Sequence, residues 1–329
     1  MDEFYIFKSG TIKRKNGSVV LKTDEEELLI PIEQVHSIYV FVEVTLNKRV
    51  LELLNKYQIF VLFFNYYGNL IGSFNPVSKR PVGRILINQV NAFQQEQIRV
   101  YIAKTIQQHS IKNCLALLKY YQKKGEEIQT QIELLRVTLM NIEYASSVEE
   151  ILLLEARAKK EYYSAFDIIL RRTPYTFERR SIKPPRNQVN AVMSFGYSVL
   201  YGLILAELHR SRLYPEVPFI HSENRPGYGL QYDLADIYKP IYIDRLVLGM
   251  LRRERFEEQD FEVSEDGGVY LSAEGKKKFL YEFDERLQKT VQYGTQRKSY
   301  RSIIRGDLHR LISFLDNTEG ELRFYLNVW

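Results

Sequence analysis

Residues 219–240, FIHSENRPGYGLQYDLADIYKP, place a histidine in a loop rich in proline and glycine, ahead of two aspartates three positions apart. The spacing predicts that Asp233 and Asp236 lie on one face of a short helix that Pro240 ends. Two carboxylates so close are unfavourable unless they share a cation. Taken singly, the simpler interpretations are a packed or exposed His221, and an acid that caps the helix or faces solvent.

A further carboxylate lies in the helix predicted over residues 146–170. Helical spacing places Glu155 in the middle of the apolar stripe of this helix. A buried carboxylate is costly without a cation, a metal ion or a dense set of donors. One interpretation is a buried salt bridge to Lys159 or Arg157 on the same helix. Together with a histidine and an aspartate, however, the glutamate completes a mixed oxygen and nitrogen set that suits Mg²⁺ or Mn²⁺.

Several common catalytic motifs are absent from the sequence. It contains no H-E-x-x-H and no pair of cysteines, which disfavours zinc hydrolysis. It also lacks a G-x-x-x-x-G-K-[ST] loop, a G-x-G-x-x-G after a strand and a G-x-S-x-G elbow. A hard divalent metal beside basic residues favours phosphodiester chemistry, because the metal polarises the phosphate while arginines hold the backbone.

Basic residues gather in two stretches. Residues 171–186 hold six of them against the single acid Glu178, so this segment alone matches the net charge of +5 of the chain. Near the C-terminus, Arg297, Arg301 and Arg305 are spaced by four residues and are predicted to share one helical face. Each stretch could hold a nucleic-acid backbone or be only a solvated face.

The predicted elements fall into two domains and a linker. Residues 1–75 predict a small β-rich domain, in which Asn16-Gly17 favours a two-residue hairpin turn. Residues 76–84 contain two prolines and are predicted to be a linker. Residues 85–329 are predicted to be mainly α-helical, with one further hairpin at Asp266-Gly267 before a final helical stretch. The expected fold class is therefore α+β.

Composition indicates where the protein works. A single cysteine, Cys114, cannot form an internal disulfide, which suits a reducing compartment. The N-terminal MDEFYIFKSG lacks the pattern of a signal peptide, and no stretch is expected to approach the roughly 18 apolar residues that a membrane helix needs. The sequence therefore predicts a cytoplasmic protein with no membrane partner.

Five stretches, in this order, resemble a known family: FFNYYGNLIGSF, LEARAKKEYYSAF, PPRNQVNAVMSFGYSVLYG, FIH and YDLADIYKP. The chain resembles, over nearly its full length, the CRISPR-associated endonuclease and integrase, the first-numbered Cas protein. The resemblance implies an N-terminal β-sandwich-like domain that forms a homodimer, joined to a helical catalytic domain. It also implies that two dimers flank a dimer of the small second-numbered Cas protein, and that the assembly holds double-stranded and branched DNA.

The resemblance further implies the site residues and the reaction. Glu155, His221 and Asp236 would bind a divalent metal, Mg²⁺ or Mn²⁺, while Asp233 would support the site and Tyr201 would lie near the DNA. The implied reaction is transesterification, in which a DNA 3′-OH attacks a phosphodiester of the CRISPR repeat and inserts a spacer. Metal-dependent cleavage of branched DNA is the related nuclease activity.

The glutamate motif departs from the family in one respect. Leu154 and Ala156 flank Glu155, where members of the family often carry a glycine. Two other functions stay open on the sequence: a nucleic-acid-binding scaffold whose acids are structural, and a metal hydrolase that acts on a small phosphorylated substrate.

Overall fold

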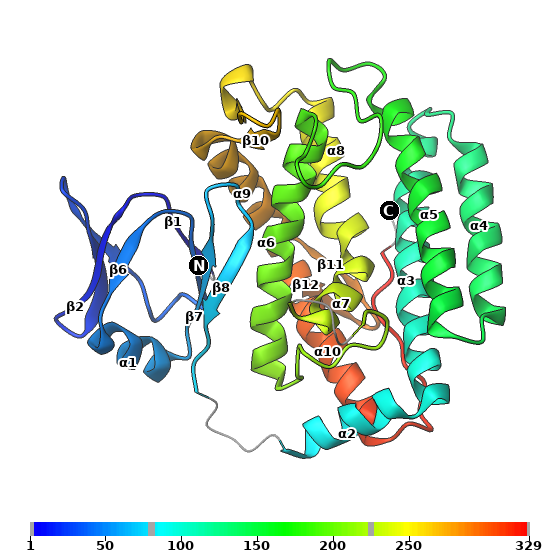
Figure 1. Cartoon of the computed structure of the whole chain (residues 1–329), viewed down its shortest axis with the longest axis horizontal. Coiled ribbons are helices and arrows are strands. Elements are labelled where there is room, and N and C mark those ends of the chain that lie inside the picture. Colours follow the sequence, from blue (N-terminus) through cyan, green and yellow to red (C-terminus); the bar gives the residue numbers. More distant parts are fainter. Residues whose placement is uncertain (1–2, 78–82, 223–226, 328–329) are drawn as a thin grey trace. The chain divides into compact units, whose positions relative to one another are not determined.

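The computed structural model describes residues 3–77, 83–222 and 227–327. The chain divides into two compact units, Met1–Pro81 and Val82–Trp329. The first is built mainly of strands and the second mainly of helices (Figure 1). The expected α+β class, with a β-rich N-terminal part and a larger helical part, is confirmed. Helix α2 (Gly83–Gln94) begins two residues before residue 85, where the helical domain was expected to begin.

Two four-stranded sheets, in the orders β1-β5-β7-β8 and β4-β3-β2-β6, make up the N-terminal unit. Their aliphatic side chains, such as those of Ile12, Leu21, Ile38 and Val61, share one core, which makes the unit a β-sandwich. The elements are β1 (Glu3–Ile6), β2 (Gly10–Lys15), β3 (Ser18–Lys22), β4 (Glu27–Ile30), β5 (Ser37–Val40), β6 (Val44–Leu46), α1 (Lys48–Tyr57), β7 (Phe60–Phe64) and β8 (Leu70–Phe74).

The turn between β2 and β3 has the predicted chemistry. Asn16 and Gly17 have φ angles of 49° and 80°. A two-residue hairpin turn of this type needs positive φ at both central positions, which asparagine and glycine tolerate best. The hairpin predicted at Asn16-Gly17 is therefore present.

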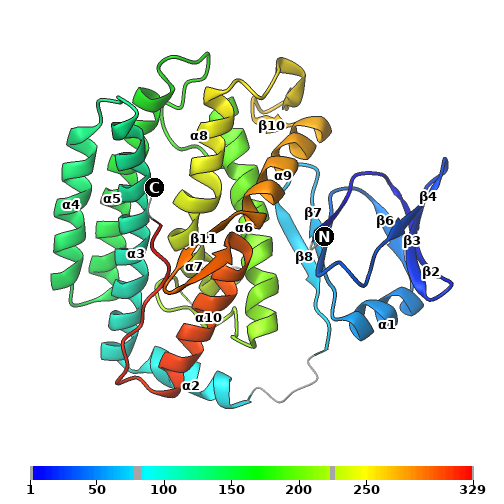
Figure 2. The same ribbon diagram turned by 180° about the vertical axis from the view of Figure 1, so that it is seen from behind.

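Helices dominate the C-terminal unit, and α3, α4 and α5 lie side by side in both views (Figures 1 and 2). Its helices are α2, α3 (Glu96–Lys123), α4 (Gln129–Tyr144), α5 (Val148–Leu170), α6 (Gln188–Ser211), α7 (Gly229–Lys239), the π-helical turn η1 (Pro240–Asp244), α8 (Arg245–Arg252), the 3₁₀ turn η2 (Glu258–Asp260), α9 (Ala273–Gln288) and α10 (Tyr300–Asp316). Two short hairpins complete it, β9 (Phe261–Val263) with β10 (Val269–Leu271), and β11 (Thr290–Tyr293) with β12 (Gln296–Ser299).

Helix α6 forms the centre of this unit. A Cβ atom at Gly196 would lie 2.7 Å from Ile243 and 2.8 Å from Phe279, so only glycine allows this approach. Contrary to the expectation that no stretch is apolar enough, α6 has the length and composition of a membrane helix. However, 89% of its most apolar window is buried inside the structure, as in the core helix of a globular domain.

Two other local predictions are wrong. Arg297 does not share a helical face with Arg301 and Arg305, because it lies in β12 and α10 begins only at Tyr300. The turn at Gly294 (φ 61°) and the hydroxyl of Ser299, which accepts the amide of Ser302, fix these boundaries.

Pro240 does not end the helical path either. The α-helical hydrogen bonds stop at Lys239, but the chain continues through η1, where the amide of Arg245 donates to the carbonyl of Pro240, and then into α8. Proline lacks an amide proton but can begin a new turn, so the wider π-helical spacing absorbs it.

Candidate active site

Glu155 projects from the buried face of α5. Ser147 begins this helix by accepting the amide of Glu150 at 3.2 Å. The side chain of Glu155 accepts a hydrogen bond from Gln107 Nε2 of α3 at 3.1 Å, and its other oxygen forms an ion pair with Lys159. The salt bridge considered from the sequence is therefore present. Burial, followed by the nearby Asp236 carboxylate, raises the pKa of Glu155 above its usual range.

Asp236 reaches the same ammonium group from α7. Its Oδ2 lies 3.0 Å from Lys159 Nζ, and its Oδ1 lies 2.6 Å from Lys239 Nζ. Burial by itself would raise the pKa of Asp236, but the two lysines outweigh it and hold this pKa well below the usual range. Two carboxylates and two ammonium groups thus form a buried set without net charge, which we call the balanced set: Glu155, Lys159, Asp236 and Lys239.

Asp233 does not join the balanced set; its side chain binds His221 instead. The Asp233 carboxylate accepts the amides of Phe219, Ile220 and His221 at 2.6, 3.0 and 3.1 Å. One of its oxygens also lies 2.6 Å from Nδ1 of the His221 ring. This hydrogen bond places the ring proton on Nδ1 and leaves Nε2 as the nitrogen that can bind a ligand.

Aromatic rings connect the histidine to the balanced set. The Tyr232 ring lies 5.9 Å from the His221 ring and packs edge-on against Tyr201 at 4.9 Å. Lys239 Nζ in turn lies 5.3 Å from the Tyr201 ring centre and 5.1 Å from that of Tyr197. Tyr201 therefore lies between the histidine and the lysine that binds Asp236.

The predicted metal ligands come together only in part. Among the residues that the structure describes, no three histidine, cysteine, aspartate or glutamate side chains are grouped so as to hold one ion. Glu155 and Asp236 nevertheless meet at one half-buried cation, Lys159, and supply the hard oxygen donors that Mg²⁺ and Mn²⁺ prefer. These two residues fit a divalent metal, while the participation of His221 stays a prediction.

The sequence analysis did not identify two residues that matter for this site, Lys239 and Asp244. Lys239 lies three residues after Asp236, a spacing that could have suggested their ion pair. No neighbouring residue in the sequence points to the role of Asp244, because its partners lie on other helices: Tyr162 of α5 at 2.7 Å and Tyr197 of α6 at 2.6 Å. Burial raises the pKa of Asp244 to about 6.

The basic segment 171–186 divides into structural and exposed residues. The guanidinium of Arg180 donates to Asn190 at 2.9 Å and to Ser194 at 3.0 Å, which ties the segment to α6. Arg171 lies 3.5 Å from the buried Glu126. Arg179 and Lys183 are exposed and line a pocket of about 610 Å³ in this loop.

The C-terminal basic stretch is also partly structural. Arg305 donates two hydrogen bonds, of 3.0 and 3.1 Å, to the buried Glu207 of α6. Arg297, Arg301 and Arg305 therefore do not form the continuous face that the sequence predicted as a possible contact for a nucleic-acid backbone.

Solved structures share this fold. A Cas1 protein from Thermotoga maritima superposes with a TM-score of 0.87 and is 32% identical, over 99% of this chain and 100% of that one. A casposase bound to its integration product reaches 0.88 at 20% identity, over 98% of this chain and 93% of that one. A Cas6-RT-Cas1–Cas2 complex reaches 0.84 at 19% identity, over 99% of this chain and 36% of that one. The fold class is that of Cas1-like proteins.

Sequence comparison gives the family. The family model described as CRISPR associated protein Cas1 matches residues 4–285. A CRISPR-associated endonuclease Cas1 from Thermodesulfovibrio yellowstonii is 34% identical over 99% of this chain and 98% of its own length. The chain belongs to the Cas1 family, as the resemblance had indicated.

Proposed function

We propose that this chain is a metal-dependent DNA endonuclease and integrase that inserts new spacers into a CRISPR array by transesterification. The observation that carries the proposal is the meeting of two buried carboxylates, from α5 and α7, at the single ammonium group of Lys159. A fold that only binds nucleic acid has no need to desolvate two acids side by side. The endonuclease named among the relatives supports the same activity.

Glu155, Asp236 and His221 would hold the proposed Mg²⁺ or Mn²⁺. The bound metal would polarise the scissile phosphodiester and stabilise charge on the attacking or leaving oxygen. Asp233 fixes the ring of His221 with Nδ1 protonated, so that Nε2 can serve as a ligand. Lys239 keeps Asp236 ionised, as a metal ligand must be.

The exposed basic side chains of the 171–186 segment are proposed to bind the phosphate backbone of double-stranded and branched DNA. Arg179 and Lys183 are exposed beside Arg180, which anchors the loop to α6. Arginine and lysine contacts to phosphates position a duplex without reading its sequence. Tyr201, close to the balanced set, is proposed to lie near this DNA.

The proposed assembly is a homodimer that works with the small second-numbered Cas protein, Cas2, in the cytoplasm. A neighbour of the same fold was solved as a complex that includes Cas2, which supports this partner. The N-terminal β-sandwich is the proposed dimerisation unit. The single thiol, Cys114, is buried, which suits the reducing compartment.

The test is strand transfer and cleavage on branched DNA with Mn²⁺, comparing the natural chain with His221→Ala. We expect the variant to lose both activities while it still folds and binds DNA. His309→Ala is the matched control, because His309 is exposed on α10 away from this site. Full activity in His221→Ala, or no metal-stimulated activity in the natural chain, would favour the scaffold function. Activity that does not depend on Arg179 and Lys183 would favour the small-substrate hydrolase.

A further inference from the structure

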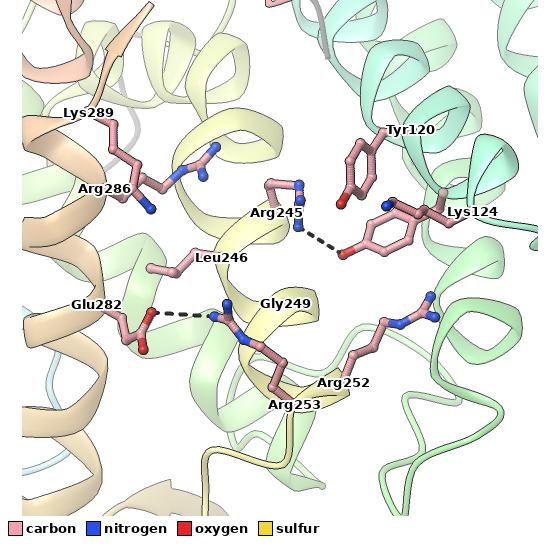
Figure 3. Close-up of a pocket in the computed structure, with 11 residues that line it drawn as sticks. Tyr120, Lys124, Arg245, Leu246, Gly249, Arg252, Arg253, Glu282, Arg286 and Lys289 are labelled. Carbon is pink, nitrogen blue, oxygen red and sulfur yellow. Dashed lines mark hydrogen bonds and ion pairs between the residues drawn. The ribbon is translucent and has the colours of Figure 1, made fainter.

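A second charged site lies between the C-terminal end of α3, helix α8 and the C-terminal half of α9 (Figure 3). It is a pocket of about 300 Å³, and none of its lining residues belongs to the balanced set. Glu282 is the acid among the eleven residues that line it. Six of these eleven are basic: Lys124, Arg245, Arg252, Arg253, Arg286 and Lys289.

Two of the arginines already have carboxylate partners. Arg252 Nη1 lies 2.7 Å from the buried Glu126. Arg253 Nη2 lies 3.4 Å from Glu282. Their charges are therefore compensated within the protein, and they shape the wall of the pocket more than they attract a ligand.

Arg245 and Arg286 differ from them. Neither forms an ion pair with any carboxylate in the described parts of the chain, and Arg245 reaches only the Tyr121 hydroxyl, at 3.5 Å. The Nε atom of Arg245 and the Nη2 atom of Arg286 are buried without a hydrogen-bond partner among the described residues. Burial lowers the pKa of Arg286, and the charge of Arg245 acts in the same direction. Two half-buried cations that have buried nitrogen atoms and no carboxylate partner are costly, which indicates that an anion belongs between them.

Both guanidinium groups are held in place. Arg286 Nε donates to the carbonyl of Ile241 at 2.7 Å. The Arg245 guanidinium stacks on the ring of Tyr120, with its carbon 3.9 Å from the ring centre. Figure 3 shows that the two side chains reach in from different helices, Arg245 from α8 and Arg286 from α9. Fixed side chains lose little conformational entropy when they bind a ligand.

We propose that this pocket binds a phosphate group, carried by a small nucleotide-like anion or by the end of a nucleic-acid strand. Planar guanidinium groups donate paired hydrogen bonds to phosphate oxygens, which a single charge does not match. The volume of about 300 Å³ is at the small end of ligand pockets, so it accommodates one phosphorylated group rather than a duplex. This site is separate from the proposed metal site and does not depend on it.

Gly249 of α8 allows a sharp test. A Cβ atom at this position would lie 3.4 Å from Arg245 Nη1. Gly249→Asp therefore places a carboxylate where the ligand phosphate would bind, and Gly249→Asn is its neutral match in size. Because Gly249 lies inside a helix, both substitutions also replace a poor helix former, so neither is expected to unfold α8.

The experiment is isothermal titration of the full chain with inorganic pyrophosphate, without divalent metal. We expect Gly249→Asp and Arg286→Gln to bind at least about tenfold more weakly than the natural chain, and Gly249→Asn, which fills the same space without a charge, to lose clearly less affinity than Gly249→Asp. Arg323→Gln, at an exposed arginine outside the pocket, should leave the affinity unchanged. No pyrophosphate binding by the natural chain, or equal affinity of the Asp and Asn variants, would overturn the proposal.

A second titration distinguishes the two sources of the phosphate. Single-stranded oligonucleotides with a 5′-phosphate or a 5′-hydroxyl are compared on the Asn and Asp variants. A preference for the phosphorylated strand that the Asp variant loses assigns the pocket to strand ends. Equal binding of the two strands, with pyrophosphate still bound, assigns it to a small anion. Because the metal site plays no part in either titration, failure of the proposed integrase activity would leave these results interpretable.

Discussion

Two buried aspartates, eight residues apart, have pKa values that are shifted in opposite directions. Asp236, at the end of α7, is 2% exposed, and Asp244, at the end of η1, is 1% exposed. Asp236 faces the ammonium groups of Lys159 and Lys239, which hold its pKa well below the usual range. Asp244 accepts hydrogen bonds from two tyrosine hydroxyls, and burial raises its pKa to about 6. Because the two side chains are about equally buried, the charge of the partner decides the direction in which each pKa is shifted.

This difference assigns the two aspartates different tasks. A carboxylate whose pKa is held well below the usual range, as that of Asp236 is, stays ionised and can bind a metal ion. Asp244 instead joins α5 and α6 to η1 through Tyr162 and Tyr197. The balanced set is thus suited to chemistry. The Asp244 cluster is part of the core beside it, since Tyr197 contacts both Asp244 and Lys239.

The largest expected effect is on the pH dependence of stability at Asp244. A folded-state pKa of about 6, against an ordinary 3.8, means that the neutral form stabilises the fold at low pH, and that this stability is lost as pH rises from about 4 through 6. Two pKa units correspond to about 3 kcal/mol. We expect the difference in unfolding free energy between the natural chain and Asp244→Asn to change by about this amount between pH 4 and pH 8, in urea denaturation.

Asp316→Asn is the control for this measurement. Asp316 is only partly buried and pairs with Arg84 on the surface, so Asp316→Asn is expected to change the unfolding free energy little. Asp307 also has a pKa raised to about 6, but it is present in every variant and cancels in the difference. A flat curve for Asp244→Asn would remove the contrast between the two aspartates.

A smaller effect is expected when the balanced set loses one cation. Lys159→Met leaves Glu155 and Asp236 facing each other without their shared ammonium group, so the unfolding free energy at pH 8 should fall by about 2 kcal/mol. The loss should shrink as pH falls, because Glu155, whose pKa is already raised, takes up a proton before an ordinary glutamate does. Lys160→Met, at the exposed neighbouring lysine, should change little. Equal losses in the two variants would show that Lys159 is not a partner of the acids.

The smallest effect concerns cations outside the buried sets. Arg179→Ala combined with Lys183→Ala removes two exposed charges that are proposed to contact phosphates. The slope of log affinity for duplex DNA against log salt should become shallower by about 2, with folding unchanged. Gel-shift titrations over a salt series measure it, and Lys277→Ala, a cation paired with Glu274 on α9, serves as the control. An unchanged slope would assign DNA binding to another surface.

The sequence was informative where local rules decide the structure. Glu155 was expected to be buried because its neighbours at helical spacing are apolar, and the structure buries it. The Asn16-Gly17 turn followed from the backbone preferences of two residues. Both features depend on a few adjacent positions.

The sequence was less informative where distant residues decide. Lys159 and Asp236 are 77 positions apart, and Asp244 meets tyrosines from two other helices, so no local pattern shows these contacts. Arg297 was placed on a helix because its spacing from Arg301 fits one, but cross-strand pairing of β11 with β12 overrides this pattern. The charge state of a buried acid likewise depends on which long-range partner it meets.

The most direct test of the central claim is Mn²⁺ binding together with strand transfer in Asp236→Asn, compared with the natural chain. The proposed metal site predicts that the variant still folds, loses measurable Mn²⁺ binding, and slows strand transfer on branched DNA by at least about a hundredfold. Mn²⁺ affinity and strand transfer that match the natural chain would contradict the assignment, and would leave the balanced set as a structural ion-pair network.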